Sequence, residues 1–166
     1  MANEAGQGCV ARGSSIDAYT FVSQGAPASI GGSCNKLEVY TAASVGVGSA
    51  NFAFFTAVGN VLTPVAGTRI VGLNTGTAGG CQTFVAGVDF TAFTVYSGNY
   101  LGCYCTENEN YALSGGSGLW YVAGDKTDTA DVTFSNDADG IDALSADIVT
   151  AGGLSIPVAM YNRQNQ

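Results

Sequence analysis

The chain has 166 residues, of which 46% are hydrophobic and only 11% charged, and 13 Asp and Glu against 5 Lys and Arg give a net charge of -8. High hydrophobicity with few charges excludes intrinsic disorder, and five cations are too few for a surface that binds nucleic acid or an anionic membrane. Because the chain has no histidine, it lacks the usual base of Ser-His-Asp and Cys-His catalysis and the commonest metal ligand.

The residue pattern predicts strands throughout. β-Branched and aromatic residues outnumber the good helix formers, and such side chains suit a pleated, half-buried surface. Apolar runs and polar–apolar alternation, punctuated by Gly and Pro, mark the candidate strands. In chain order they cover residues 17–24, 34–41, 51–58, 68–73, 82–85, 88–96, 100–105, 119–123 and 154–161. Loops are expected at 107–110 and 114–118, and no strand is expected in the acid-rich stretch 125–147.

About nine short strands at this spacing, with no helical period, predict an all-β fold. We expect an antiparallel, jelly-roll-like β-sandwich. One domain should span residues 1–166, with an N-terminal arm of about residues 1–16. Residues 51–58 are apolar on both faces, with Phe52 and Phe54 opposite Phe55, which indicates a central core strand or an interface strand.

Five cysteines leave at least one without an intrachain partner; they are Cys9, Cys34, Cys81, Cys103 and Cys105. Cys103 and Cys105 should share one strand face, in a poor orientation for a mutual bridge. One residue separates them, which is fewer than the two to four residues between paired cysteine ligands of zinc. Structural or disulfide use is therefore preferred to metal binding. Which cysteines pair stays open.

The start of the chain has neither the basic nor the apolar region of a secretory signal. No apolar run reaches the length of a transmembrane helix. We therefore expect synthesis in a host cytoplasm, followed by exposure of the cysteines to an oxidising exterior, as on a virus particle.

Asp137, Asp139 and Asp142 form a candidate calcium site, because alternating acids around Gly140 could supply oxygen ligands on a tight loop. The EF-hand spacing is not met, since loop positions 1 and 12 would be Ser135 and Ala146. The alternative is a turn in which the carboxylates accept local backbone hydrogen bonds.

Trp120, Tyr121 and Tyr111 form a candidate platform for a sugar ring. Aromatic faces stack on apolar sugar faces, and Asn108 and Asn110 lie nearby in the sequence. The alternative, which is preferred, places Trp120 in the core with its indole N–H bonded to a carbonyl.

Glu107 and Glu109 would share a face of an extended segment, and paired carboxylates can hydrolyse glycosides. A solvated loop is the preferred interpretation, because nothing apolar nearby in the sequence would raise either pKa. We therefore predict no catalytic residues, no cofactor and no enzymatic activity.

Two segments carry a resemblance: 94–105, TVYSGNYLGCYC, and 115–125, GGSGLWYVAGD. Together they resemble a jelly-roll module common among phage-associated proteins, over about residues 35–125. Asn99 stands where that pattern has Asp, and Cys103 and Cys105 replace apolar positions.

The resemblance implies a structural virion protein, such as a capsid decoration, head-fibre or tail accessory protein. Its expected partners are further copies of itself, with a trimer favoured because trimers suit three-fold positions of a shell, and a capsid or tail protein. The alternative function is a carbohydrate-binding module or lectin, possibly calcium-dependent, that binds surface glycans.

Overall fold

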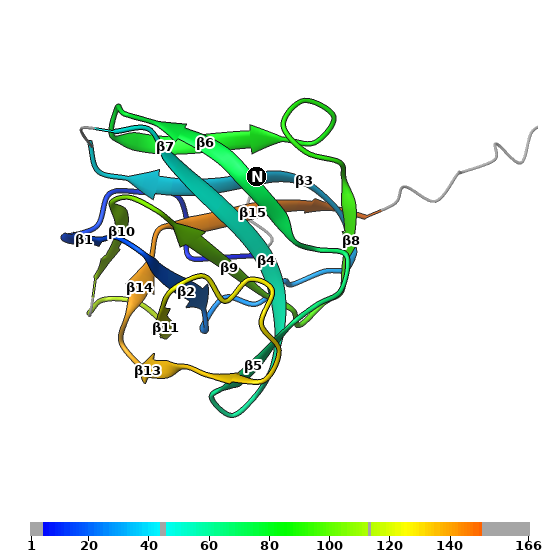
Figure 1. Ribbon diagram of the computed structural model, residues 1–166. Coiled ribbons are helices and arrows are strands. Elements are labelled where there is room, and N and C mark those ends of the chain that lie inside the picture. The colour runs from blue at the N-terminus through cyan, green and yellow to red at the C-terminus, as the bar shows by residue number, and fades with distance from the viewer. Residues whose placement is uncertain (1–4, 44–45, 113, 151–166) are drawn as a thin grey trace, which may run out of the picture.

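The computed structural model describes residues 5–43, 46–112 and 114–150, and this part of the chain is built of antiparallel strands in two sheets (Figure 1). The predicted all-β antiparallel sandwich is confirmed. Within these residues there are fifteen short strands rather than about nine, and no helix that is long and apolar enough to cross a membrane.

The first sheet is centred on one long strand that pairs with four neighbours (Figure 1). Its strands are β1 (Ser14–Ile16), β10 (Glu109–Ala112), β3 (Gly32–Thr41), β15 (Leu144–Val149), β7 (Gly80–Val85), β8 (Phe93–Val95) and β14 (Ile141–Asp142). Alternation along the central β3 buries Leu37 and Val39 on one face. Cys34, three residues before Leu37, is buried as well, because the pairing with β15 shifts register between Lys36 and Cys34.

The second sheet contains the long strand β4, which lies between β5 and β9 (Figure 1). Its strands are β12 (Val132–Thr133), β5 (Val61–Pro64), β4 (Gly48–Val58), β9 (Tyr100–Cys105), β2 (Tyr19–Ser23), β11 (Leu119–Ala123), β13 (Ser135–Asp137) and β6 (Ile70–Gly76). Phe52 and Phe54 of β4 pack into the core that contains residues of both sheets, whereas Phe55 packs into a second cluster with Trp120 and Phe134. The expectation of a central strand with two apolar faces is confirmed.

Several boundaries differ from the prediction. The acid-rich stretch 125–147 contains β12, β13, β14 and most of β15, and the expected loop 107–110 contains the start of β10. Conversely, the expected strand 88–96 shrinks to β8, because residues 85–90 turn, with the Asp89 carboxylate accepting the backbone N–H of Val85 at 2.8 Å. The expected strand 154–161 lies outside the described residues.

The described part of the expected N-terminal arm is joined to the fold. Ala5 and Ala146 exchange two backbone hydrogen bonds, and residues 14–16 form β1 against β10. A disulfide links Cys9 to Cys81 of β7. The three remaining cysteines are buried and free; they are Cys34, Cys103 and Cys105.

Candidate functional site

An aromatic groove lies at the end of the sandwich where β2 and β11 approach β1 and β10. A cavity of about 230 Å³ is lined by Ile16, Tyr19, Phe21, Tyr111 and Tyr121. Phe21 is its centre, with its ring centroid 5.1 Å from that of Tyr111 and 6.4 Å from that of Tyr121. The groove therefore offers several ring faces and edges to a ligand, in the manner of apolar sites that bind organic molecules.

The structure brings together two members of the predicted sugar platform and excludes the third. Tyr111 and Tyr121 both line the groove. Trp120 points to the opposite face of β11, is 4% exposed, and donates its indole N–H to Oδ1 of Asn60 at 3.0 Å. Because consecutive strand residues face opposite ways, Trp120 and Tyr121 cannot form one platform.

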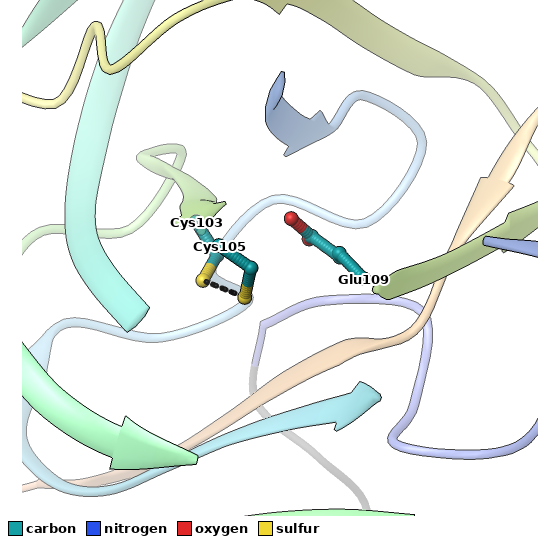
Figure 2. A group of neighbouring side chains, drawn as sticks. All are labelled: Cys103, Cys105 and Glu109. Atoms are coloured by element: carbon teal, nitrogen blue, oxygen red, sulfur yellow. Dashed lines mark hydrogen bonds between the residues drawn. The ribbon is translucent and has the colours of Figure 1, made fainter. Parts of the chain in front are cut away.

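Behind the groove lies a buried group that we call the acid–thiol cluster: Cys103, Cys105 and Glu109. The two features lie on hydrogen-bonded neighbouring strands, since Phe21 is paired with Cys103 and Ile16 with Glu109 in the sheet registers. The two sulfur atoms lie 3.6 Å apart. Figure 2 shows the Glu109 carboxyl group directed from β10 toward the two thiols of β9.

The Glu109 side chain is the least expected feature of this cluster. It is 0% exposed, and neither carboxyl oxygen has a hydrogen-bond partner. Burial, with the nearby Cys105 and Asp142, raises the pKa of Glu109 well above its ordinary value. Burial likewise raises the pKa of the Cys103 thiol well above its ordinary value. Burial therefore favours the protonated form of both groups.

The expectation of a solvated loop holding Glu107 and Glu109 is wrong for Glu109. Glu107 is only partly buried, whereas Glu109 points into the protein. Between them, Asn108 adopts a left-handed conformation with φ of 49° and donates its backbone N–H to the Asp17 carboxylate. Asn tolerates this conformation better than most residues. The Asn at position 108 is therefore the local signal in the sequence that the chain changes direction between Glu107 and Glu109.

Asp142 is a second fully buried acid near the cluster. Its Oδ2 accepts a 2.5 Å hydrogen bond from the Ser23 hydroxyl, and its Oδ1 accepts the Leu144 N–H at 3.4 Å. Burial outweighs these hydrogen bonds and raises the pKa of Asp142 to about 6. The Arg12 guanidinium donates to the backbone carbonyl of Asp142 at 3.0 Å and brings a positive charge nearby.

The predicted calcium ligands do not meet. Asp137 accepts the backbone N–H of Asp139 at 3.1 Å in a local turn, and Asp139 is exposed, whereas Asp142 is bonded to Ser23 in the interior. Within the described ranges, the acid–thiol cluster is the one group of three or more possible ligands whose atoms lie within 4.8 Å of one another. The calcium site is therefore corrected to the alternative, a turn closed by its own carboxylate.

No protein-family model, curated protein or solved structure matches this chain.

Proposed function

We propose that this chain is a structural virion protein, a capsid decoration or head or tail accessory protein that assembles on the particle surface through contacts between its own copies. The resemblance of segments 94–105 and 115–125 to a phage-associated module supports this, and so does the antiparallel sandwich. The observation that carries the proposal is the distribution of charge and exposed apolar side chains.

About two fifths of the chain is almost free of charge. Residues 39–106 contain two charged side chains, Arg69 and Asp89. In the described part of the chain, nine large hydrophobic side chains are well exposed, and seven of them fall in this range. Val58, at the end of β4, is 84% exposed, and Val88 is 83% exposed. Interface cores are depleted in charge, so this neutral segment suits contact with another copy.

Substitutions in the β4–β5 hairpin test the proposed assembly most directly. Val58 and Val61 are partners across the hairpin and line a shallow cavity with Asp131. We expect wild-type protein to form a discrete oligomer, with a trimer favoured, in light scattering on a sizing column. Val58→Lys with Val61→Lys should shift the mass toward the monomer, because paired cations in an apolar contact repel one another.

The matched control is Val10→Lys, since Val10 is 50% exposed but lies outside the neutral segment. It should leave the mass unchanged. A wild-type monomer at every concentration tested, or equal dissociation by Val10→Lys, contradicts assembly through this hairpin. Purified particles from the source of the sequence should contain the chain, and its absence from them contradicts the virion role.

The aromatic groove favours a second function, the binding of a surface saccharide. Its rings are partly exposed at Tyr19, Tyr111 and Tyr121, and a sugar ring can stack on such faces while its hydroxyl groups remain hydrated. Saccharide binding is compatible with display on the surface of a particle, where the protein would contact glycans.

We expect a glycan array to detect binding that Tyr121→Ala and Tyr111→Ala each weaken about two- to twelvefold, as loss of one stacking ring costs roughly 0.5–1.5 kcal/mol. Tyr96→Ala, which removes a ring that is 65% exposed elsewhere, is the control and should bind normally. A calcium chelator should have no effect, because the three Asp residues do not meet. Binding that survives both groove variants contradicts the saccharide site.

A further inference from the structure

The acid–thiol cluster has the dimensions of a metal site. Two thiolates bound to one tetrahedral zinc ion at about 2.3 Å lie about 3.8 Å apart, and the sulfur atoms of Cys103 and Cys105 are 3.6 Å apart. A carboxyl oxygen of Glu109 lies within 4.8 Å of both sulfurs. An oxygen and a sulfur bound to one tetrahedral zinc ion lie roughly 3.5 Å apart, so closing a three-ligand set requires a shift of at most about 1.3 Å.

A second observation points to a ligand at the same place. The carboxyl group of Glu109 is completely buried, and neither oxygen has a partner at full hydrogen-bond geometry. The nearest polar neighbour is Cys105, whose thiol and backbone act on the carboxyl group, and the side chain extends from β10 toward the two cysteines (Figure 2). A buried polar group that is left unpaired costs free energy. A cation placed between the carboxylate and the two thiolates would remove that cost.

We propose that Cys103, Cys105 and Glu109 bind one thiophilic divalent cation of the zinc class. Two sulfur ligands select zinc-like metals over calcium and magnesium, which prefer oxygen. A carboxylate is an ordinary third ligand for zinc. The fourth position is left to a water molecule or another small ligand.

In the sequence, the short Cys-x-Cys spacing of Cys103 and Cys105 favours structural or disulfide use over metal binding. That spacing is awkward where all ligands come from one loop, but here the two sulfurs lie on one face of β9. The third ligand comes from β10 in the opposite sheet, after the left-handed turn at Asn108. The set is therefore assembled by the packing of the two sheets.

Binding is a proton exchange without oxidation or reduction. Two S–H bonds and one O–H bond break, two metal–sulfur bonds and one metal–oxygen bond form, and up to three protons pass to solvent. Affinity should therefore rise steeply with pH.

The test begins with protein that has its Cys9–Cys81 disulfide intact. Thiol titration in denaturant should find three thiols, those of Cys34, Cys103 and Cys105. Because the site is buried, the protein is refolded with Zn²⁺, desalted and analysed for metal, and one zinc per chain is expected. Refolding with Co²⁺ should give thiolate-to-cobalt charge transfer and the visible bands of a tetrahedral ion.

Three variants assign the site. Cys105→Ala should lower zinc affinity at least about 100-fold, by loss of one of three ligands. Glu109→Gln should weaken binding and reduce the protons released by one, as measured by calorimetry in buffers of different ionisation enthalpy. Cys34→Ala removes a buried thiol outside the cluster and should keep full zinc and cobalt binding.

Three outcomes overturn the proposal. One is no metal retained by folded wild-type protein, and another is equal retention by the Cys105→Ala and Glu109→Gln variants. The third is a thiol count of one with a bond between Cys103 and Cys105, because the cluster would then be a redox pair. Circular dichroism of each variant establishes that a loss of metal is not a loss of the fold.

Discussion

At pH 8, metal-free Glu109→Leu is expected to be more stable than the wild-type protein by roughly 1–3 kcal/mol, the cost of a buried polar group without a hydrogen-bond partner. Glu109 is fully buried without a hydrogen-bond partner. At this pH the wild-type protein must either hold a proton on the carboxyl group or bury its charge, and leucine does neither. Urea unfolding measures the difference.

The pH dependence gives this prediction a second readout. An acid whose pKa is raised by folding binds its proton in the folded but not the unfolded chain, so stability falls as pH rises between the two pKa values. For Asp142 this fall runs from about pH 4 to about pH 6. Glu109, whose pKa burial raises well above its ordinary value, adds a second fall that begins above about pH 4, and this contribution should vanish in Glu109→Leu.

Glu107→Leu is the matched control, because Glu107 lies two residues away and is only partly buried. Its stability should stay within about 0.5 kcal/mol of wild type, as for most surface changes. With saturating zinc the order should reverse, since only the wild type gains binding free energy on folding. Destabilisation by Glu109→Leu in the metal-free protein would show that the carboxyl group has partners that compensate its burial.

Removal of the disulfide by the double change Cys9→Ala and Cys81→Ala should cost about 4 kcal/mol of stability by the chain-entropy relation for a loop of this size. The two residues are 72 positions apart. The bond ties the N-terminal segment to β7, and that segment also donates backbone hydrogen bonds from Gly6 to Ala26 and from Gly8 to Leu144.

Urea unfolding of the oxidised wild type, the reduced wild type and the double variant checks this prediction. The reduced wild type and the double variant should unfold together, at lower urea than the oxidised protein. Equal stability of all three would mean that the N-terminal segment contributes little to the folded state, against its observed pairing with Ala146 and Leu144.

The strands with strong local patterns could be predicted from the sequence. The segments of β2, β3, β4, β9 and β11 carry β-branched and aromatic residues with clear polarity patterns, and such patterns act over a few residues. The same period of two already implied that Trp120 and Tyr121 face opposite ways, although their proximity in the sequence suggested a shared platform.

The strands of the acid-rich stretch 125–147 could not be predicted from the local sequence. Asp and Asn disfavour strands by their own propensity, yet Ser135–Asp137 pairs with β11, and Leu144–Val149 pairs with β3. The paired residues are 16 positions apart for Trp120 and Asn136 and 109 apart for Leu37 and Ala146. Hydrogen bonds and apolar contacts with these partner strands outweigh the local preference.

Residue patterns within short segments were sufficient to predict the fold class, the two apolar faces of β4 and the shared face of Cys103 and Cys105. The burial of Glu109 against those thiols, the pairing of Cys9 with Cys81 and the shared groove of Tyr111 and Tyr121 follow from the tertiary structure. Each of these depends on which distant strands pack together, and the energy of such contacts has no signature in a short stretch of chain.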